Sequence, residues 1–210
     1  MIISHKYKFV FFATMKTASS SVGRALGDKL KTKDPDFINY KYSLLDRRIN
    51  PTFSSDKKIL QTKYSKHTAY HQTNEKEFKN YFKFSFVRNP WDRAVSWWFF
   101  NQNLHKDHPT RKKIKDLLNF KDFILSAPPS MWYQSQYRFT KGCDFIGRFE
   151  DLQNDFNIVC NKLGLGKIEL TKRNSSKHLP YNKYYNNETR QIVAEKYAKD
   201  IEYFGYKFGK

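Results

Sequence analysis

The strongest constraint on the fold of this chain is a short apolar strand that runs directly into a hydroxyl-rich turn with one lysine. A strand is predicted at 7–13, the turn follows, and a helix is predicted at 19–31. This order of elements places backbone N–H groups at a helix N-terminus, where they and the helix dipole attract anions. The sequence therefore predicts a phosphate-binding turn that carries Lys16.

This turn differs from the phosphate loop of nucleoside-triphosphate enzymes. That loop has the pattern G-x-x-x-x-G-K-[ST]. The present chain has Lys16 and Thr17 at the last two positions of this pattern, but it has neither glycine. The difference restricts which phosphate compound the turn can hold.

The rest of the chain alternates strand-like and helix-like segments, which favours a P-loop-like three-layer α/β fold. Its central sheet is expected to be mainly parallel and flanked by helices. Strands are predicted at 7–13, 37–42, 59–63, 83–87 and 144–148, and helices at 19–31, 75–81, 90–104, 120–126, 150–164 and 187–199. The polar stretches 46–58 and 105–116 are predicted to be surface loops. The 210 residues suffice for a single domain over residues 1–210.

The helix predicted at 150–164 has a clear apolar face. Its apolar positions, spaced for one helix face, are Leu152, Phe156, Val159, Cys160 and Leu163. Gly164 follows the last of them, and glycine is the usual residue just past a helix end. The pattern predicts that this helix packs on the sheet and ends at Gly164.

The chain is strongly basic, with 39 Lys and Arg against 20 Asp and Glu and a net charge of +19. Such a charge favours polyanionic partners: nucleic acid, an acidic polysaccharide, a phosphorylated cofactor or an anionic membrane. The alternative is that the charge serves solubility alone, in a chain whose composition also reflects codon bias.

The sequence also bears on the compartment. Cys143 and Cys160 have no metal-ligand spacing and are expected to be two reduced thiols. No apolar run approaches the roughly 20 residues of a membrane span, and the first residues lack the features of a signal peptide. We expect a complete, cytoplasmic chain without a transmembrane segment.

A second motif lies at 84–98, where a buried strand ends in Arg88 and a helix starts at Pro90. Ligands of open α/β sheets gather at the carboxyl ends of the strands, and the planar guanidinium suits bidentate contact with phosphate. Ser96, two helical turns later, adds a hydroxyl. Arg93 is interpreted as a salt-bridging helix residue. If the strands before the two motifs are neighbours, Arg88 lies beside the lysine turn.

Together these motifs resemble the two cofactor-binding signatures of sulfotransferases. The matching segments are Lys16–Ser21 and Phe86–Ser96, and the resemblance extends to 144–152 and to parts of the tail at 174–185 and 200–206. The greatest similarity is to carbohydrate sulfotransferases of the heparan 2-O-sulfotransferase and chondroitin or HNK-1 type. Enzymes of this kind use 3′-phosphoadenosine 5′-phosphosulfate (PAPS) as sulfuryl donor and need no metal.

The resemblance implies two anion sites for the donor. The 5′ end is assigned to the lysine turn, with Lys16, Thr17, Ala18, Ser19, Ser20 and Ser21. The 3′-phosphate is assigned to Arg88 and Ser96, under a late loop with Ser175, Ser176 and Lys177. Lys16 is expected to neutralise the charge that develops on the leaving phosphate.

The acceptor hydroxyl requires a general base, and imidazole titrates near neutral pH. His67 stands 21 residues before Arg88, a location that resembles that of the catalytic histidine in the heparan 2-O-type enzymes. His71 is the second candidate, while His5, His105 and His108 are interpreted as surface residues. The implied acceptor is a carbohydrate or another hydroxyl-bearing molecule. An acceptor with an anionic group would suit the positive charge of the chain.

Two other functions remain open at this level. One is an ATP-using P-loop phosphotransferase, disfavoured by the absent glycines and by the lack of a strand ending in a metal-binding aspartate. The other is a non-catalytic binder of polyanions or nucleic acid, suggested by charge and interleaved aromatic residues. No recognised nucleic-acid module occurs in the chain, so no nucleic-acid partner is expected.

Overall fold

The structure is a computed structural model that describes residues 1–30, 38–39, 76–104, 107–114, 116–171 and 178–209. The chain divides into two units, and each is described by itself. Unit 1 comprises Met1–Val87 and Arg138–Arg173, and unit 2 comprises Arg88–Tyr137 and Asn174–Lys210.

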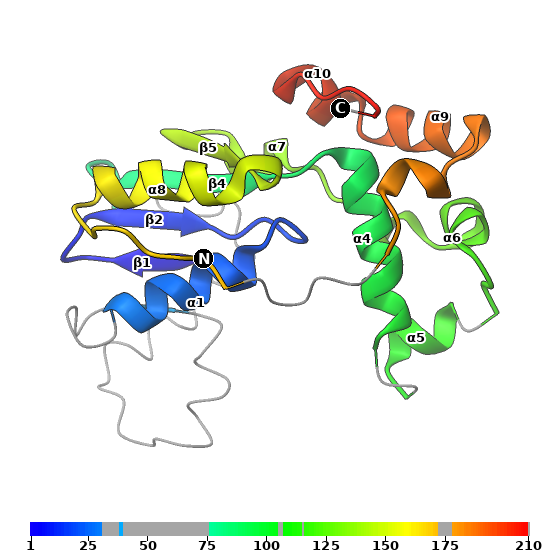
Figure 1. The fold of residues 1–210 in the computed structure, drawn as a ribbon, viewed down its shortest axis with the longest axis horizontal. Helices are drawn as coiled ribbons and strands as arrows, with labels where there is room; N and C mark the ends of the chain where they lie inside the picture. The colour runs from blue at the N-terminus through cyan, green and yellow to red at the C-terminus, as the bar shows by residue number, and fades with distance from the viewer. Residues whose placement is uncertain (31–37, 40–75, 105–106, 115, 172–177, 210) are drawn as a thin grey trace. The chain divides into compact units, whose positions relative to one another are not determined.

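Unit 1 contains a five-stranded sheet in the order β3-β1-β2-β4-β5. The strands are β1 (Ile2–Ser4), β2 (Phe9–Phe12), β3 (Ile38–Asn39), β4 (Phe82–Val87) and β5 (Phe145–Arg148). β2 pairs parallel with β4, and β4 pairs parallel with β5, whereas β1 is antiparallel to both β2 and β3. Only β1 therefore opposes the common strand direction. The predicted α/β fold, with a mainly parallel sheet flanked by helices, is confirmed (Figure 1).

The sheet differs from the prediction at its beginning. Residues before position 7 were not expected to form a strand, yet β1 is buried at every position and pairs with β2 through a four-residue turn, 5–8. The predicted strand 37–42 is represented by β3, and the predicted strand 59–63 lies outside the described residues.

The larger core of unit 1 lies between one face of the sheet and two helices, α1 (Ser19–Leu30) and α8 (Leu152–Lys162). Its buried members are Ile2, Phe9, Phe11, Ala13, Val22, Leu26, Leu30, Phe84, Phe86, Phe156, Val159, Cys160 and Leu165. The opposite face carries a smaller cluster of Met1, Ile3, Val10, Phe12 and Phe78. Because successive strand residues point to opposite faces, the run Phe9–Phe12 contributes to both clusters.

The helix predicted at 150–164 is confirmed in its packing and its end. A short 3₁₀ helix, η3 (Phe149–Asp151), precedes α8. The predicted apolar face of α8 packs in the larger core. Gly164 follows with a φ of 63°, and the Leu165 N–H donates to the Cys160 carbonyl at 2.9 Å. This is the hydrogen-bond pattern of a glycine-terminated helix.

Unit 2 is helical. Its main helices are α4 (Pro90–Gln102), α6 (Phe120–Ser126), α9 (Asn187–Lys196) and α10 (Ala198–Phe204). Shorter ones are α5 (Pro109–Lys113), η2 (Pro129–Met131) and η4 (Tyr181–Tyr184), and α7 (Tyr137–Thr140) lies where the chain passes to unit 1. The predicted helix 120–126 is confirmed to the residue.

Three predicted segments need correction. The helix 187–199 is two helices that meet at Tyr197, which is buried and hydrogen-bonded to the Trp132 carbonyl at 2.6 Å. The helix 75–81 is wrong, because residues 76–80 form a turn closed by Tyr81 N–H donation to the Phe78 carbonyl. The predicted loop 105–116 contains the short helix α5.

Candidate active site

The lysine turn lies between β2 and α1 and has an unusual backbone. The angle φ is +64° at Lys16 and +57° at Ala18, whereas Met15, Thr17 and Ser19 have negative values. Alternating signs of φ turn successive N–H groups to the same side and form an anion-binding concavity, a nest. In most such loops the residues with positive φ are glycines, because glycine has no Cβ. Here Lys16 and Ala18 adopt these angles themselves.

Hydroxyl groups brace the turn from inside unit 1. The Thr17 hydroxyl donates to the Thr14 carbonyl at 2.9 Å, and the Thr14 and Ser85 hydroxyls lie 2.9 Å apart. Ser85, on β4, also donates to the Phe12 carbonyl at 2.7 Å. All three hydroxyl side chains are fully buried. They tie the turn to the neighbouring strand, and the proton of the Thr17 hydroxyl is engaged by the Thr14 carbonyl.

Helix α1 continues the nest with three serines and no acidic residue in its first turn. The first N–H groups of a helix have no intrahelical acceptor, and the dipole makes this end positive. Ser19 and Ser21 are buried, while Ser20 is half-buried. Ala18 accepts hydrogen bonds from the N–H groups of Ser21 and Val22 at 2.8 and 3.1 Å, which closes the first turn. The turn and helix together fit a phosphate.

Unit 2 starts with Arg88, which is 8% exposed. Its Nε donates to Asp92 Oδ2 at 2.7 Å, and Asp92 and Ser96 lie one turn apart on α4, on the same face. Pro90 is at the first position of α4, as predicted, and the Asn89 side chain caps the helix by accepting from Trp91 N–H at 3.1 Å. The Arg88 guanidinium is therefore held at its Nε edge by Asp92.

The comparison with protein families decides the class. The sequence model of the sulfotransferase family matches residues 1–207. The chain belongs to the sulfotransferase family. It is thus an enzyme of the transferase class, and sulfuryl transfer is the reaction of its family. No curated protein and no solved structure matches the chain.

The residues expected to bind the donor in this sulfotransferase fall in both units. Lys16 to Ser21 belong to unit 1, and Arg88 and Ser96 belong to unit 2. The strands before them, β2 and β4, are parallel neighbours within unit 1, with Phe12 opposite Ser85. His67, His71, Ser175, Ser176 and Lys177 lie outside the described residues.

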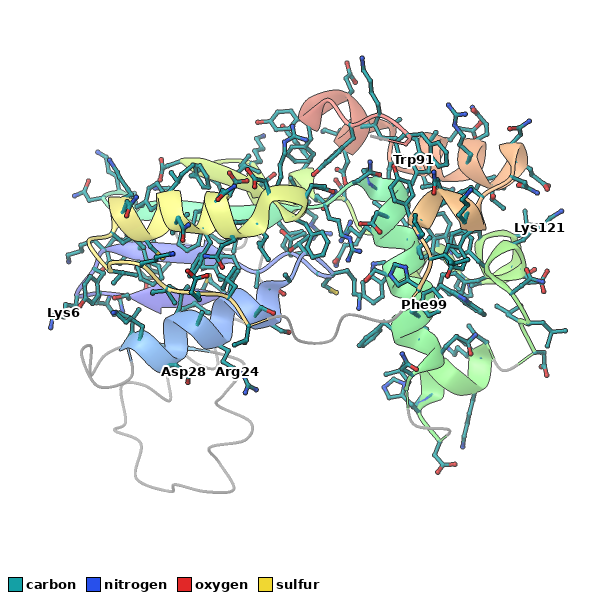
Figure 2. The ribbon with its side chains drawn as sticks, in the orientation of Figure 1. Lys6, Arg24, Asp28, Trp91, Phe99 and Lys121 are labelled. Atoms are coloured by element: carbon teal, nitrogen blue, oxygen red, sulfur yellow. The ribbon has the colours of Figure 1, made fainter. Side chains whose placement is uncertain are left out.

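The histidines among the described residues are His5, His108 and His178. His5 Nδ1 lies 2.7 Å from the Tyr81 hydroxyl, so it is half-buried rather than a pure surface residue. His108 is exposed, as expected. His178 stacks on Phe99 of α4, with ring centroids 4.9 Å apart; Figure 2 labels Phe99 and Trp91 on this helix.

Arg93, interpreted from the sequence as a salt-bridging helix residue, has a buried setting. It is fully buried, donates from Nη1 to the Gln134 carbonyl at 2.5 Å and lies over the Tyr197 ring. Trp91 and Trp98 of the same helix are buried as well. Arg93 is thus part of the interior of unit 2.

Sequence reasoning missed Asp92 and Gln136, which hydrogen-bond to Arg88, and Asp200, which holds Gln136. Asp92 has a local signal, because Arg and Asp four positions apart pair along a helix. Gln136 and Asp200 are 48 and 112 positions from Arg88 in the chain, and no sequence pattern connects them to it.

Three further observations concern the described residues only. No helix among them has the length and apolar character needed to cross a bilayer. The described His, Cys, Asp and Glu side chains include no group of three or more arranged to hold a metal ion. Both cysteines are free, and burial raises the pKa of Cys160 to about 11.

Proposed function

We propose that this sulfotransferase moves a sulfuryl group from PAPS to a hydroxyl of a carbohydrate acceptor. The observation that carries the proposal is the nest at the lysine turn. A left-handed residue other than glycine costs about 1–2 kcal/mol, and such strain persists where the surrounding structure imposes it, often at functional sites. Two such residues directly before a helix free of acidic residues in its first turn support a site for a phosphate group.

The two ends of the donor are assigned to separate groups. In this proposal the N–H groups of the turn and of Ser19 and Ser20 hold the 5′-phosphate. Arg88 and Ser96 hold the 3′-phosphate, and Ser175, Ser176 and Lys177 close over it. The hydrogen bond from Arg88 Nε to Asp92 supports this role, because it fixes the plane of a guanidinium that binds phosphate best in a bidentate manner.

The donor carries an activated sulfuryl group that is bonded to a phosphate, and this phosphate is the leaving group. When the S–O bond to that phosphate breaks, negative charge develops on the bridging oxygen. The Lys16 ammonium neutralises this charge in the transition state. The acceptor hydroxyl forms the new S–O bond and gives its proton to His67, or to His71 if His67 serves another purpose. This scheme uses no metal.

The proposal also covers the acceptor, the extent of the domain and the cellular compartment. A net charge of +19 favours anionic acceptors such as an acidic polysaccharide through long-range attraction. We propose that residues 1–210 work as one sulfotransferase domain and that the protein acts in the cytoplasm.

Ligand-induced thermal stabilisation tests the donor. At 100 times its Kd, 3′,5′-adenosine bisphosphate should stabilise the fold by about 2.7 kcal/mol. For a chain of this size that is a rise in Tm of about 5–10 °C. ATP with Mg²⁺ and a short oligonucleotide should give smaller shifts. Stabilisation by ATP–Mg²⁺ alone would favour a phosphotransferase, and stabilisation by the oligonucleotide alone would favour a nucleic-acid binder.

Turnover with labelled PAPS and a panel of glycans tests the roles. Lys16→Ala should abolish transfer while the protein stays folded, and Lys29→Ala, a half-buried lysine in the last turn of α1, is the matched control. His67→Ala should lose turnover and keep bisphosphate binding. Full turnover in Lys16→Ala would remove Lys16 from the mechanism, and lost bisphosphate binding in His67→Ala would assign His67 to the donor site.

A further inference from the structure

The main chain at Arg88 is held by one side-chain amide. Gln136 Oε1 accepts from the Arg88 N–H at 2.8 Å, and Gln136 Nε2 donates to the Arg88 carbonyl at 2.9 Å. Gln136 is fully buried. Because the two hydrogen bonds reach the peptide units on both sides of the Arg88 Cα atom, they fix the point from which the side chain projects.

Gln136 is itself fixed by a buried carboxylate. Asp200, on α10, accepts the Gln136 backbone N–H at Oδ2, at 2.7 Å. Its Oδ1 accepts from the Ser135 hydroxyl at 2.9 Å and from the Tyr137 N–H at 3.1 Å. Asp200 is 1% exposed. Hydrogen bonds to a charged acceptor are stronger than neutral ones, so this carboxylate holds residues 135–137 as a unit.

The residue after Arg88 is held from another part of the chain. Asn89 Nδ2 donates to the Lys207 carbonyl at 3.2 Å and to the Tyr181 hydroxyl at 3.3 Å. Both backbone groups of Arg88 and the side chain of Asn89 therefore have partners in later segments of unit 2. The start of α4 is fixed more firmly than a helix cap alone requires, since the cap itself needs only the Asn89–Trp91 bond.

We propose that Gln136, supported by Asp200, is a positioning residue that presents the Arg88 guanidinium to the 3′-phosphate of the donor. This inference rests on the proposed role of Arg88 in donor binding. The side chain of Arg88 is fixed at Nε by Asp92, and its backbone is fixed by Gln136. A guanidinium fixed at both ends loses less entropy on binding than a mobile one, and preorganisation of this kind increases affinity.

Calorimetric titration with 3′,5′-adenosine bisphosphate measures the effect. Gln136→Met keeps the length of the side chain and removes both hydrogen bonds to Arg88. We expect its Kd for the bisphosphate to rise about tenfold. The KM for PAPS should rise in parallel, while kcat at saturating PAPS changes less than twofold, because the variant loses binding and not chemistry.

Asn186→Ala is the matched control for a loss of stability in unit 2. Asn186 caps α9, and within the part of the chain that the structure describes it bonds to Thr189 and its own helix end. Its replacement lowers stability by removal of a helix cap and should leave the bisphosphate Kd unchanged. An equal rise of Kd in Asn186→Ala and Gln136→Met would show that general destabilisation explains the loss, and would overturn the inference.

Gln136→Glu provides a second, pH-dependent variant. A protonated carboxyl offers one donor and one acceptor, as the amide does, whereas a carboxylate offers acceptors only. The Kd of Gln136→Glu relative to wild type, measured at each pH, should therefore fall towards one as the pH is lowered. A ratio that is independent of pH, or an unchanged Kd in Gln136→Met, would overturn the positioning role. Failure of the wild type to bind the bisphosphate would instead overturn the proposed function.

Discussion

The backbone at Ala18 makes a direct prediction about stability and binding. Ala18 has a φ of +57°, a region in which a side chain with Cβ costs about 1–2 kcal/mol. Ala18→Gly relieves this strain but increases the conformational entropy of the unfolded chain, which lowers the free energy of unfolding by about 0.5–1 kcal/mol. The net expectation is a gain of about 0.5–1 kcal/mol in the free energy of unfolding, or about 1–4 °C in Tm.

The opposite substitution should have the opposite sign. Ala18→Val places a β-branched residue at positive φ, where such residues are outliers. We expect Ala18→Val to lose about 1–2 kcal/mol of stability and to bind 3′,5′-adenosine bisphosphate at least about tenfold more weakly, because the N–H groups of the nest move apart. Ala18→Gly should keep its affinity within about twofold.

Urea unfolding and calorimetric titration measure both effects on the same samples. The slope of unfolding free energy against urea should stay constant, so that midpoints report stability. Lys8→Gly is the control: Lys8 has a φ of +51° in the β1–β2 turn and should change stability without changing bisphosphate affinity. If Ala18→Val matches wild type in both assays, or if Ala18→Gly is destabilised, the reasoning from backbone strain is refuted.

Two further predictions concern the cores. A Cβ at residue 147 would lie 2.5 Å from Phe86 Cε1 and 3.0 Å from Asp155 Cβ, so Gly147→Ala should lower the free energy of unfolding by about 1–3 kcal/mol; an unchanged urea midpoint would contradict this packing. Burial raises the pKa of Tyr197 to about 12 from its usual value of 10.0. The raised pKa contributes to the free energy of unfolding, and this contribution is fully present below pH 10 and is lost as pH rises towards 12. The stability advantage of wild type over Tyr197→Phe should thus shrink by about 1.4 kcal/mol between pH 8 and pH 11, and a constant difference would contradict the shift.

Local patterns predicted much of the fold because they record interactions between residues close in sequence. The apolar face of α8 and the glycine at its end were readable from spacing and from the conformational freedom of Gly164. β1 was not readable, because three residues show no periodicity and the strand is stable only through its pairing with β2. The break between α9 and α10 depends on the burial of Tyr197 against a distant segment.

The sequence by itself determined the strand, lysine turn and helix at the start of the chain, the arginine at the end of β4 and the family to which they belong. These features depend on residue type and spacing along short segments. Only the tertiary structure decided that Lys16 and Ala18 adopt positive φ, because φ at a turn is set by the hydroxyl groups and strands that hold it. Only the tertiary structure also joined Gln136 and Asp200 to Arg88, since hydrogen bonds between distant segments form when the chain is folded and leave no local pattern.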